Sequence, residues 1–111
     1  MIKVEAWWLY TEPMDMRKGI DGLMNAIFEL TGQSIQRQSA YLFCNRNGTR
    51  MKAVIFDGAG YWCCLRRLEK GRFMWPREGK IEAMQAEQFA WLSCGLDWKR
   101  WNENLPNPLW M

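Results

Sequence analysis

Hydrophobic and polar positions change their spacing several times along the chain, and each change marks an expected element. The stretch "VEAWWLYTEP" is rich in aromatic and β-branched residues and stops at Pro13, so it predicts a first strand. Beyond Asp15, which offers a helix-capping oxygen, apolar residues recur at the spacing of one helical face: Met16, Ile20, Leu23, Met24, Ile27 and Phe28. This pattern predicts a helix over about residues 16–31, with Gly32 as its C-cap.

Two glycines fall inside this expected helix, and each costs about 0.5–1 kcal/mol relative to alanine. Because Gly19 and Gly22 lie one turn apart, we expect them to allow close packing of the helix on a sheet. Arg17 and Lys18 then lie in the first turn, where cations oppose the helix dipole and an anionic ligand would relieve that cost. The alternative is a pair of solvated surface charges.

The middle of the chain contains four short strand-like runs: "AYLFC", "RMKAVIF", "YWCCLRRL" and "RFMW". Their separators, "NRNG", "DGAG" and "EKG", have the composition of tight turns, which join antiparallel neighbours. Alternation along the second run places one set of residues on a single face of the sheet: Arg50, Lys52, Val54 and Phe56. The opposite face then carries Met51, Ala53 and Ile55.

After Pro76 the pattern predicts a brief strand over residues 80–84 and a helix over about residues 86–94, ended by Gly95. The expected fold class is α+β: a single small domain in which an antiparallel β-meander packs against one main helix plus a short C-terminal helix. We assign this domain to residues 1–98. Residues 99–111 form a tail that contains Trp, Pro and Asn.

Charge is distributed unevenly. Residues 46–80 contain nine Lys and Arg against three Asp and Glu, so this third of the chain carries +6 while the whole chain carries +3. Such asymmetry is typical of a surface that faces a polyanion. The expected meander also carries aromatic residues among its cations, and Tyr61, Trp62, Phe73 and Trp75 could stack on exposed bases or belong to the core.

No catalytic or metal site is expected. The four cysteines have no CxxC spacing and the chain has no histidine, which argues against zinc; Cys63 and Cys64 are interpreted as small buried hydrophobes. The aspartates have structural explanations, Asp15 as a cap, Asp57 as the start of a turn and Asp21 as a solvent-facing helix position. No cofactor is implied.

No apolar run approaches the roughly 20 residues that a membrane span needs, and the first residues lack the order of a signal peptide. We therefore expect a soluble cytoplasmic protein without a membrane partner.

Four motifs in order make the chain resemble a known family: "PMDMRKGIDGL", "YLFCNRNGTRMKAVIFDGAGYW", "RRLEKGRFMWP" and "CGLDW". They are similar to the small accessory protein, TnpB type, encoded beside the transposase in insertion sequences of the number sixty-six family. The resemblance implies a protein that supports transposition, while the DNA-cleaving carboxylates belong to the separate transposase. Family members usually carry Thr or Ser followed by Pro where this chain has Gln85 and Ala86.

Two kinds of partner follow, DNA and the transposase of the same element, and oligomeric state is left open. For DNA, Arg17 and Lys18 are expected to join the cations of the meander on one phosphate backbone. The expected DNA-binding residues are Arg17, Lys18, Arg50, Lys52, Arg66, Arg67 and Arg72. The alternative is a scaffold that contacts no DNA and binds the transposase through its Trp-rich tail.

Overall fold

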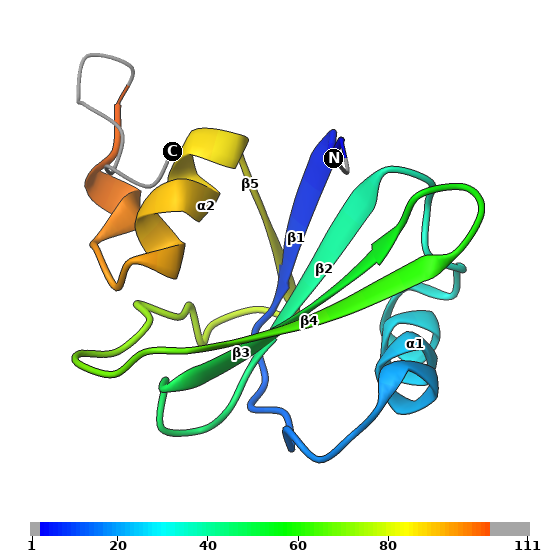
Figure 1. The fold of residues 1–111 in the computed structure, drawn as a ribbon, viewed down its shortest axis with the longest axis horizontal. Helices are drawn as coiled ribbons and strands as arrows, with labels where there is room; N and C mark the ends of the chain where they lie inside the picture. Colours follow the sequence, from blue (N-terminus) through cyan, green and yellow to red (C-terminus); the bar gives the residue numbers. More distant parts are fainter. Residues whose placement is uncertain (1–2, 103–111) are drawn as a thin grey trace.

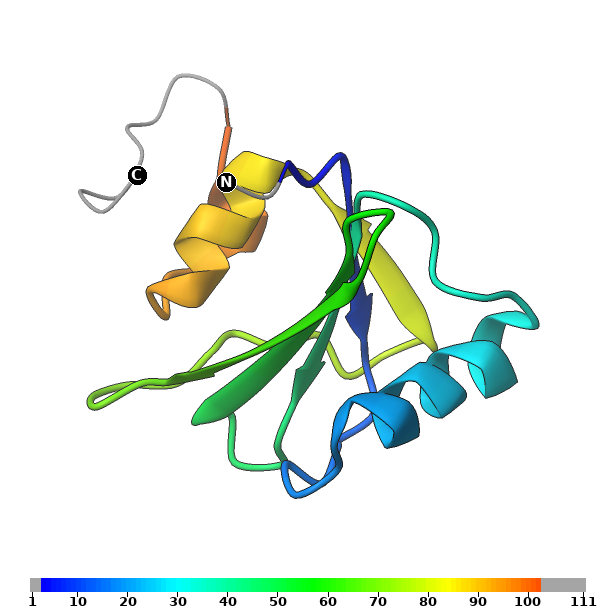
Figure 2. The same ribbon diagram turned by 45° about the vertical axis from the view of Figure 1, so that its right-hand side comes forward.

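A computed structural model describes residues 3–102, which form a five-stranded sheet with a helix against each face (Figures 1 and 2). The strand order is β4-β3-β2-β1-β5. In chain order the elements are β1 Ala6–Tyr10, α1 Ile20–Thr31, β2 Ser39–Cys44, β3 Arg50–Phe56, β4 Tyr61–Arg67, β5 Ile81–Met84, α2 Ala86–Ser93 and the 3₁₀ helix η1 Trp98–Arg100. The predicted α+β class is confirmed.

The meander β2-β3-β4 is antiparallel, as its turn residues predicted. One pairing differs from the antiparallel expectation, because β1 lies parallel to β2. The connection between these two strands contains all of α1, and only such a long crossover returns a chain to the same end of a sheet. The prediction of a strand at "RFMW" is wrong: this segment has no strand pairing, and Phe73 instead donates its N–H to the Gly48 carbonyl at 2.7 Å.

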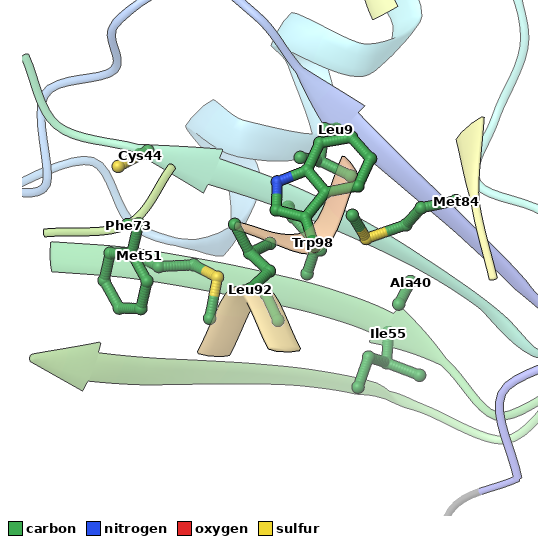
Figure 3. Close-up of a cluster of buried hydrophobic side chains, with 11 residues drawn as sticks. Leu9, Ala40, Cys44, Met51, Ile55, Phe73, Met84, Leu92 and Trp98 are labelled. Carbon is green, nitrogen blue, oxygen red and sulfur yellow. The ribbon is translucent and has the colours of Figure 1, made fainter. Parts of the chain in front are cut away.

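The core has two parts because the central strand β2 is buried on both faces. Tyr41, Phe43 and Val54 pack under α1 with Leu23 and Ile27. The other face of the sheet packs against α2 and η1, through residues labelled in Figure 3 that include Leu9, Ala40, Cys44, Met51, Ile55, Phe73, Met84, Leu92 and Trp98. The division of β3 into two faces is therefore confirmed.

Helix α1 begins four residues later than predicted. The Asp15 side chain accepts the Arg17 N–H at 2.8 Å and its carbonyl accepts the Lys18 N–H at 3.1 Å, so this segment closes a turn instead of starting the helix. Gly19 is the N-cap, in an extended conformation. Gly32 is the C-cap at φ 71°, as predicted. Phe28, assigned to the apolar face, is 55% exposed.

The explanation offered for the two glycines of α1 is also wrong. A Cβ atom at Gly19 would meet nothing within 4 Å, and one at Gly22 would meet the Lys18 side chain at 3.6 Å, which is ordinary contact. Neither glycine is required for the approach of α1 to the sheet.

Gly22→Ala is therefore expected to stabilise the protein by about 0.5–1 kcal/mol, because alanine fits the space and restricts the unfolded chain. Urea unfolding of both proteins measures the difference. Gly32→Ala is the control and should be destabilising, because Gly32 has a left-handed backbone. A loss of stability in Gly22→Ala would show that this glycine has a packing role.

Helix α2 starts at Ala86, close to the predicted position, although the family's Thr or Ser followed by Pro is absent. The Gln88 side chain accepts the backbone N–H of Gln85 at 2.8 Å and so supports the helix start.

Beyond α2, Trp98 is buried and donates its indole N–H to the Met74 carbonyl at 2.7 Å. The division of the chain at residue 98 stays a prediction, and residues 103–111 of the expected tail lie outside the described part.

Cys63 and Cys64 are exposed, which contradicts their interpretation as buried hydrophobes. They lie on β4, an edge strand whose seven residues are all exposed because neither helix covers it. Cys44, on the central strand, is buried, and this burial raises the pKa of its thiol to about 11.

Among residues 3–102, no helix is long and apolar enough to cross a bilayer.

Candidate nucleic-acid interface

The pairing of β3 with β4 places Arg50 directly opposite Arg67. Both side chains belong to the face of the sheet that α1 covers, since Arg50 alternates with Met51 of the other face. Like charges directly opposite each other on adjacent strands repel and are destabilising. An anion bound between the two guanidinium groups would remove this repulsion.

A hydrogen bond connects β3 to the segment that precedes α1. Lys52, two residues along the same face from Arg50, donates from Nζ to the Lys18 carbonyl at 2.8 Å. The Lys18 side chain lies near Gly22, at the start of α1. Of the meander cations, Lys52 therefore contacts Lys18, through the Lys18 backbone carbonyl.

An open hollow of about 440 Å³ adjoins these cations, at the end of the sheet where β2 turns into β3. Its lining residues are Met14, Asp15, Met16, Arg17, Asn45, Arg46, Asn47, Arg50 and Leu65. Arg46 was absent from the predicted site because that prediction took cations only from strands and from the first turn of the helix. Its signal in the sequence was its place in the "NRNG" turn, four residues before Arg50.

We call the cations around this hollow and on the adjoining face of β3 and β4 the basic patch: Arg17, Lys18, Arg46, Arg50, Lys52 and Arg67. Two of them already have a carboxylate partner. Arg17 forms a pair with Asp15 at 2.7 Å between Nη2 and Oδ2, and Arg67 forms one with Glu69 at 2.8 Å. The six cations and these two carboxylates leave a net charge of +4.

The other four cations of the patch have no carboxylate within ion-pair distance among the described residues: Lys18, Arg46, Arg50 and Lys52. Hydrogen bonds from the Arg17 side chain, and then from its backbone N–H, lower the pKa of Asp15 to about 2. Asp15 is therefore ionised at any physiological pH and keeps Arg17 engaged. A phosphate group would meet its strongest attraction at the four cations without a carboxylate.

Arg66 does not join the basic patch. It points to the opposite face of the sheet, where its Nε donates to the Ser93 carbonyl at the end of α2 at 2.7 Å. A cation at this position is favoured by the helix dipole, so the role seen is structural. Arg72 lines a separate hollow with Asp97 and Lys99. Of the seven predicted DNA-binding residues, the structure brings together Arg17, Lys18, Arg50, Lys52 and Arg67.

The aromatic candidates divide into exposed and packed side chains. Tyr61 and Trp62 are exposed on opposite faces of β4, Tyr61 on the face of the patch. Trp62 is 49% exposed and does not belong to the core, whereas Phe73 is buried in it. Trp75 is half-buried and donates its indole N–H to the Tyr10 carbonyl at 2.9 Å.

The turn role expected for Asp57 is confirmed. Its carboxylate accepts hydrogen bonds from the Trp62 indole and from the backbone N–H groups of Ala59 and Gly60, all at 2.8 Å, and these bonds lower its pKa. Because the pKa is lower in the folded state, this stabilisation is present at neutral pH and is lost as the pH falls through the lowered value. Asp21 is exposed in the first turn of α1. Within residues 3–102, no group of three Cys, Asp or Glu could hold a metal ion.

Fold and surface together define a small α+β protein with a mixed five-stranded sheet and a cationic patch beside one helix. A family model described as IS66 Orf2 like protein matches residues 5–103, so the chain belongs to that family. This membership indicates an accessory role in transposition.

Two similar proteins come from Sinorhizobium fredii (strain NBRC 101917 / NGR234). Uncharacterized protein y4hO is 32% identical over 93 residues, which cover 83% of this chain and 81% of the relative. Uncharacterized protein y4jC is 29% identical over 92 residues, which cover 81% of this chain and 78% of the relative. No solved structure matches the chain.

Proposed function

We propose that this protein supports transposition of an insertion sequence by binding DNA through the basic patch, without cleaving it, beside the transposase of the same element. The observation that carries the proposal is the face-to-face position of Arg50 and Arg67, with Lys52 and Lys18 next to them. Because Arg67 is paired with Glu69 at 2.8 Å, the charge without a carboxylate partner lies on Arg50, Lys52 and Lys18, and it becomes favourable against a polyanion.

The phosphate backbone is the part of DNA that fits this surface. The patch presents flexible cations from two strands, a turn and the segment before α1, and such contacts position a protein on the duplex without reading sequence. Phosphate contacts release condensed counterions, so binding should weaken steeply as salt is added. We therefore expect little preference between unrelated duplexes of equal length.

The proposal assigns no chemical step to this chain. Asp15 is bound by Arg17, and Asp57 by two backbone N–H groups of its own turn and by the Trp62 indole, so both carboxylates have structural roles. DNA cleavage in transposition is assigned to the transposase.

Titration of a labelled duplex carrying the end of the element should show salt-dependent binding, with log K falling linearly against log salt concentration. With Mg²⁺ or Mn²⁺ the same duplex should remain intact on a denaturing gel. Nicking that disappears in Asp15→Ala or Asp57→Ala would contradict the non-catalytic proposal. Absence of salt-dependent binding would contradict the DNA-binding proposal.

The scaffold alternative is favoured by one observation, the exposure of Met74 and Leu96. Exposed apolar side chains indicate a protein-binding site where they form a continuous patch. The Trp-rich tail invoked for this alternative lies mostly outside the described residues. Deletion of residues 105–111 should abolish co-purification with the transposase if the tail is the contact, and should leave DNA affinity unchanged.

A further inference from the structure

Strand β4 is an unprotected edge of the sheet. It lies at one end of the strand order, all seven of its residues are exposed, and residues 61–65 carry no charge and no proline. The opposite edge strand, β5, is short, with four residues, and contains the charged Glu82, and both features disfavour pairing with another strand. Apart from Arg66 and Arg67 at its end, this edge is uncharged and offers free N–H and C=O groups to another strand, and proteins usually shield such edges unless they bind a partner.

The outward-facing backbone groups of β4 follow from the ladder with β3. Asp57 donates its N–H to the Gly60 carbonyl at 3.1 Å, and Leu68 donates its N–H to the Thr49 carbonyl at 3.0 Å. Since hydrogen-bonded pairs alternate along an antiparallel ladder, the even-numbered residues of β4 bond to β3. The N–H and C=O groups that point away from the sheet belong to Tyr61, Cys63, Leu65 and Arg67.

We propose that β4 pairs with β4 of a second copy of this chain, antiparallel and centred on Cys64. In this register Cys63 exchanges hydrogen bonds with Leu65 of the second copy, and Tyr61 exchanges them with Arg67. Cys64 lies opposite its own equivalent in a non-hydrogen-bonded pair. The two sheets then form one continuous sheet of ten strands, twice the five in each copy.

Charge complementarity selects a second copy as the occupant. One end of β4 carries Arg66 and Arg67, and the other carries Tyr61 and Trp62, with Asp57 bonded to the Trp62 indole. Antiparallel pairing centred on Cys64 brings the cations of each copy to the aromatic and acidic end of the other, where cation–π contact is favourable.

The register follows from the same strand. Centring on Cys64 pairs all seven residues, whereas a shift of two residues in either direction leaves part of each strand without a partner.

The symmetry axis is perpendicular to the sheet, so both α1 faces, and with them both basic patches, lie on the same side of the dimer. The dimer itself does not depend on DNA binding, and its test contains no DNA.

Sedimentation velocity without DNA should give a mass of about 26 kDa, twice the 13.2 kDa of the chain. Cys63→Pro removes an outward N–H while leaving the bonds to β3, and proline is tolerated at a strand edge. This variant should dimerise at least about tenfold more weakly, because each of the two copies loses one hydrogen bond of the interface. A wild-type protein that sediments at 13.2 kDa would overturn the proposal.

Disulfide trapping tests the register and does not depend on the proline variant. Cys63→Ser retains Cys64, and mild oxidation with diamide should join two copies rapidly, since opposed residues in a non-hydrogen-bonded pair have Cα atoms about 4.5 Å apart. Cys64→Ser is the matched control. It retains Cys63, whose equivalents lie diagonally about 7–8 Å apart, so it should react much more slowly. Equal rates, or a faster Cys64→Ser protein, would overturn the register.

Discussion

Four cations of the basic patch have no carboxylate partner, and a variant without these four should bind duplex DNA far more weakly than the wild type. The slope of log K against log salt concentration should fall by up to about 3.6. Each lost phosphate contact lowers the slope by about 0.9. The loss of affinity should be similar for unrelated duplexes, because these contacts read no bases. Fluorescence anisotropy over a range of salt concentrations measures both quantities. The variant combines Lys18→Ala, Arg46→Ala, Arg50→Ala and Lys52→Ala.

A second variant with the same net charge separates the patch from the overall charge. It replaces four exposed cations outside the patch with alanine: Lys70, Arg72, Lys99 and Arg100. If the patch is the binding surface, this control should keep most of the wild-type affinity and salt slope. Equal losses in the two variants would show that net charge, and not the patch, governs binding. Arg72 is in the control because it lines a separate hollow with Asp97 and Lys99.

Trp98→Ala should destabilise the protein by about 3–5 kcal/mol, the usual cost of removing a large buried aromatic side chain. Trp98 is 3% exposed and packs in the part of the core under α2 (Figure 3). Its indole N–H donates to the Met74 carbonyl. Since small domains are stable by only about 5–15 kcal/mol, this loss is a large share of the total. Urea unfolding followed by circular dichroism measures it.

Two related variants show whether the effect comes from burial. Trp98→Phe keeps most of the apolar contact but removes the indole donor, so it should cost less than Trp98→Ala. Trp101→Ala, three residues later at a half-buried position, should cost the least of the three. An unfolding midpoint unchanged by Trp98→Ala would show that the segment after α2 contributes nothing to the core.

Elements with a local cause were predictable from the sequence. The turns "NRNG" and "DGAG" mark the ends of β3, and the alternation inside it assigned Val54 and Met51 to opposite faces. Gly32 ends α1 because the left-handed conformation favours glycine, whatever the rest of the fold. Elements decided by competition between local structures were not predictable. The Asp15 carboxylate can cap a helix or close a turn with the same kind of hydrogen bond, and here it closes a turn with Arg17.

The candidate site was partly predictable, because charge content and side-chain alternation are also local properties of the chain. The sequence shows that residues 46–80 are rich in cations, and it shows that Arg66 and Arg67 point to opposite faces of a strand. It does not show which face is shared with Lys18, because that depends on the contact between Lys52 and Lys18, 34 residues apart. Arg66 was therefore grouped with the patch although it holds the end of α2.

The sequence by itself determined the resemblance to a family, the positions of most strands and turns, and the excess of positive charge in the middle of the chain. The tertiary structure alone decided the parallel pairing of β1 with β2, the exposure of Cys63 and Cys64 on an edge strand, and which five of the predicted cations lie in the basic patch. The physical reason is that backbone preferences and side-chain alternation act over a few residues. Strand order and burial depend on contacts between residues that are distant along the chain.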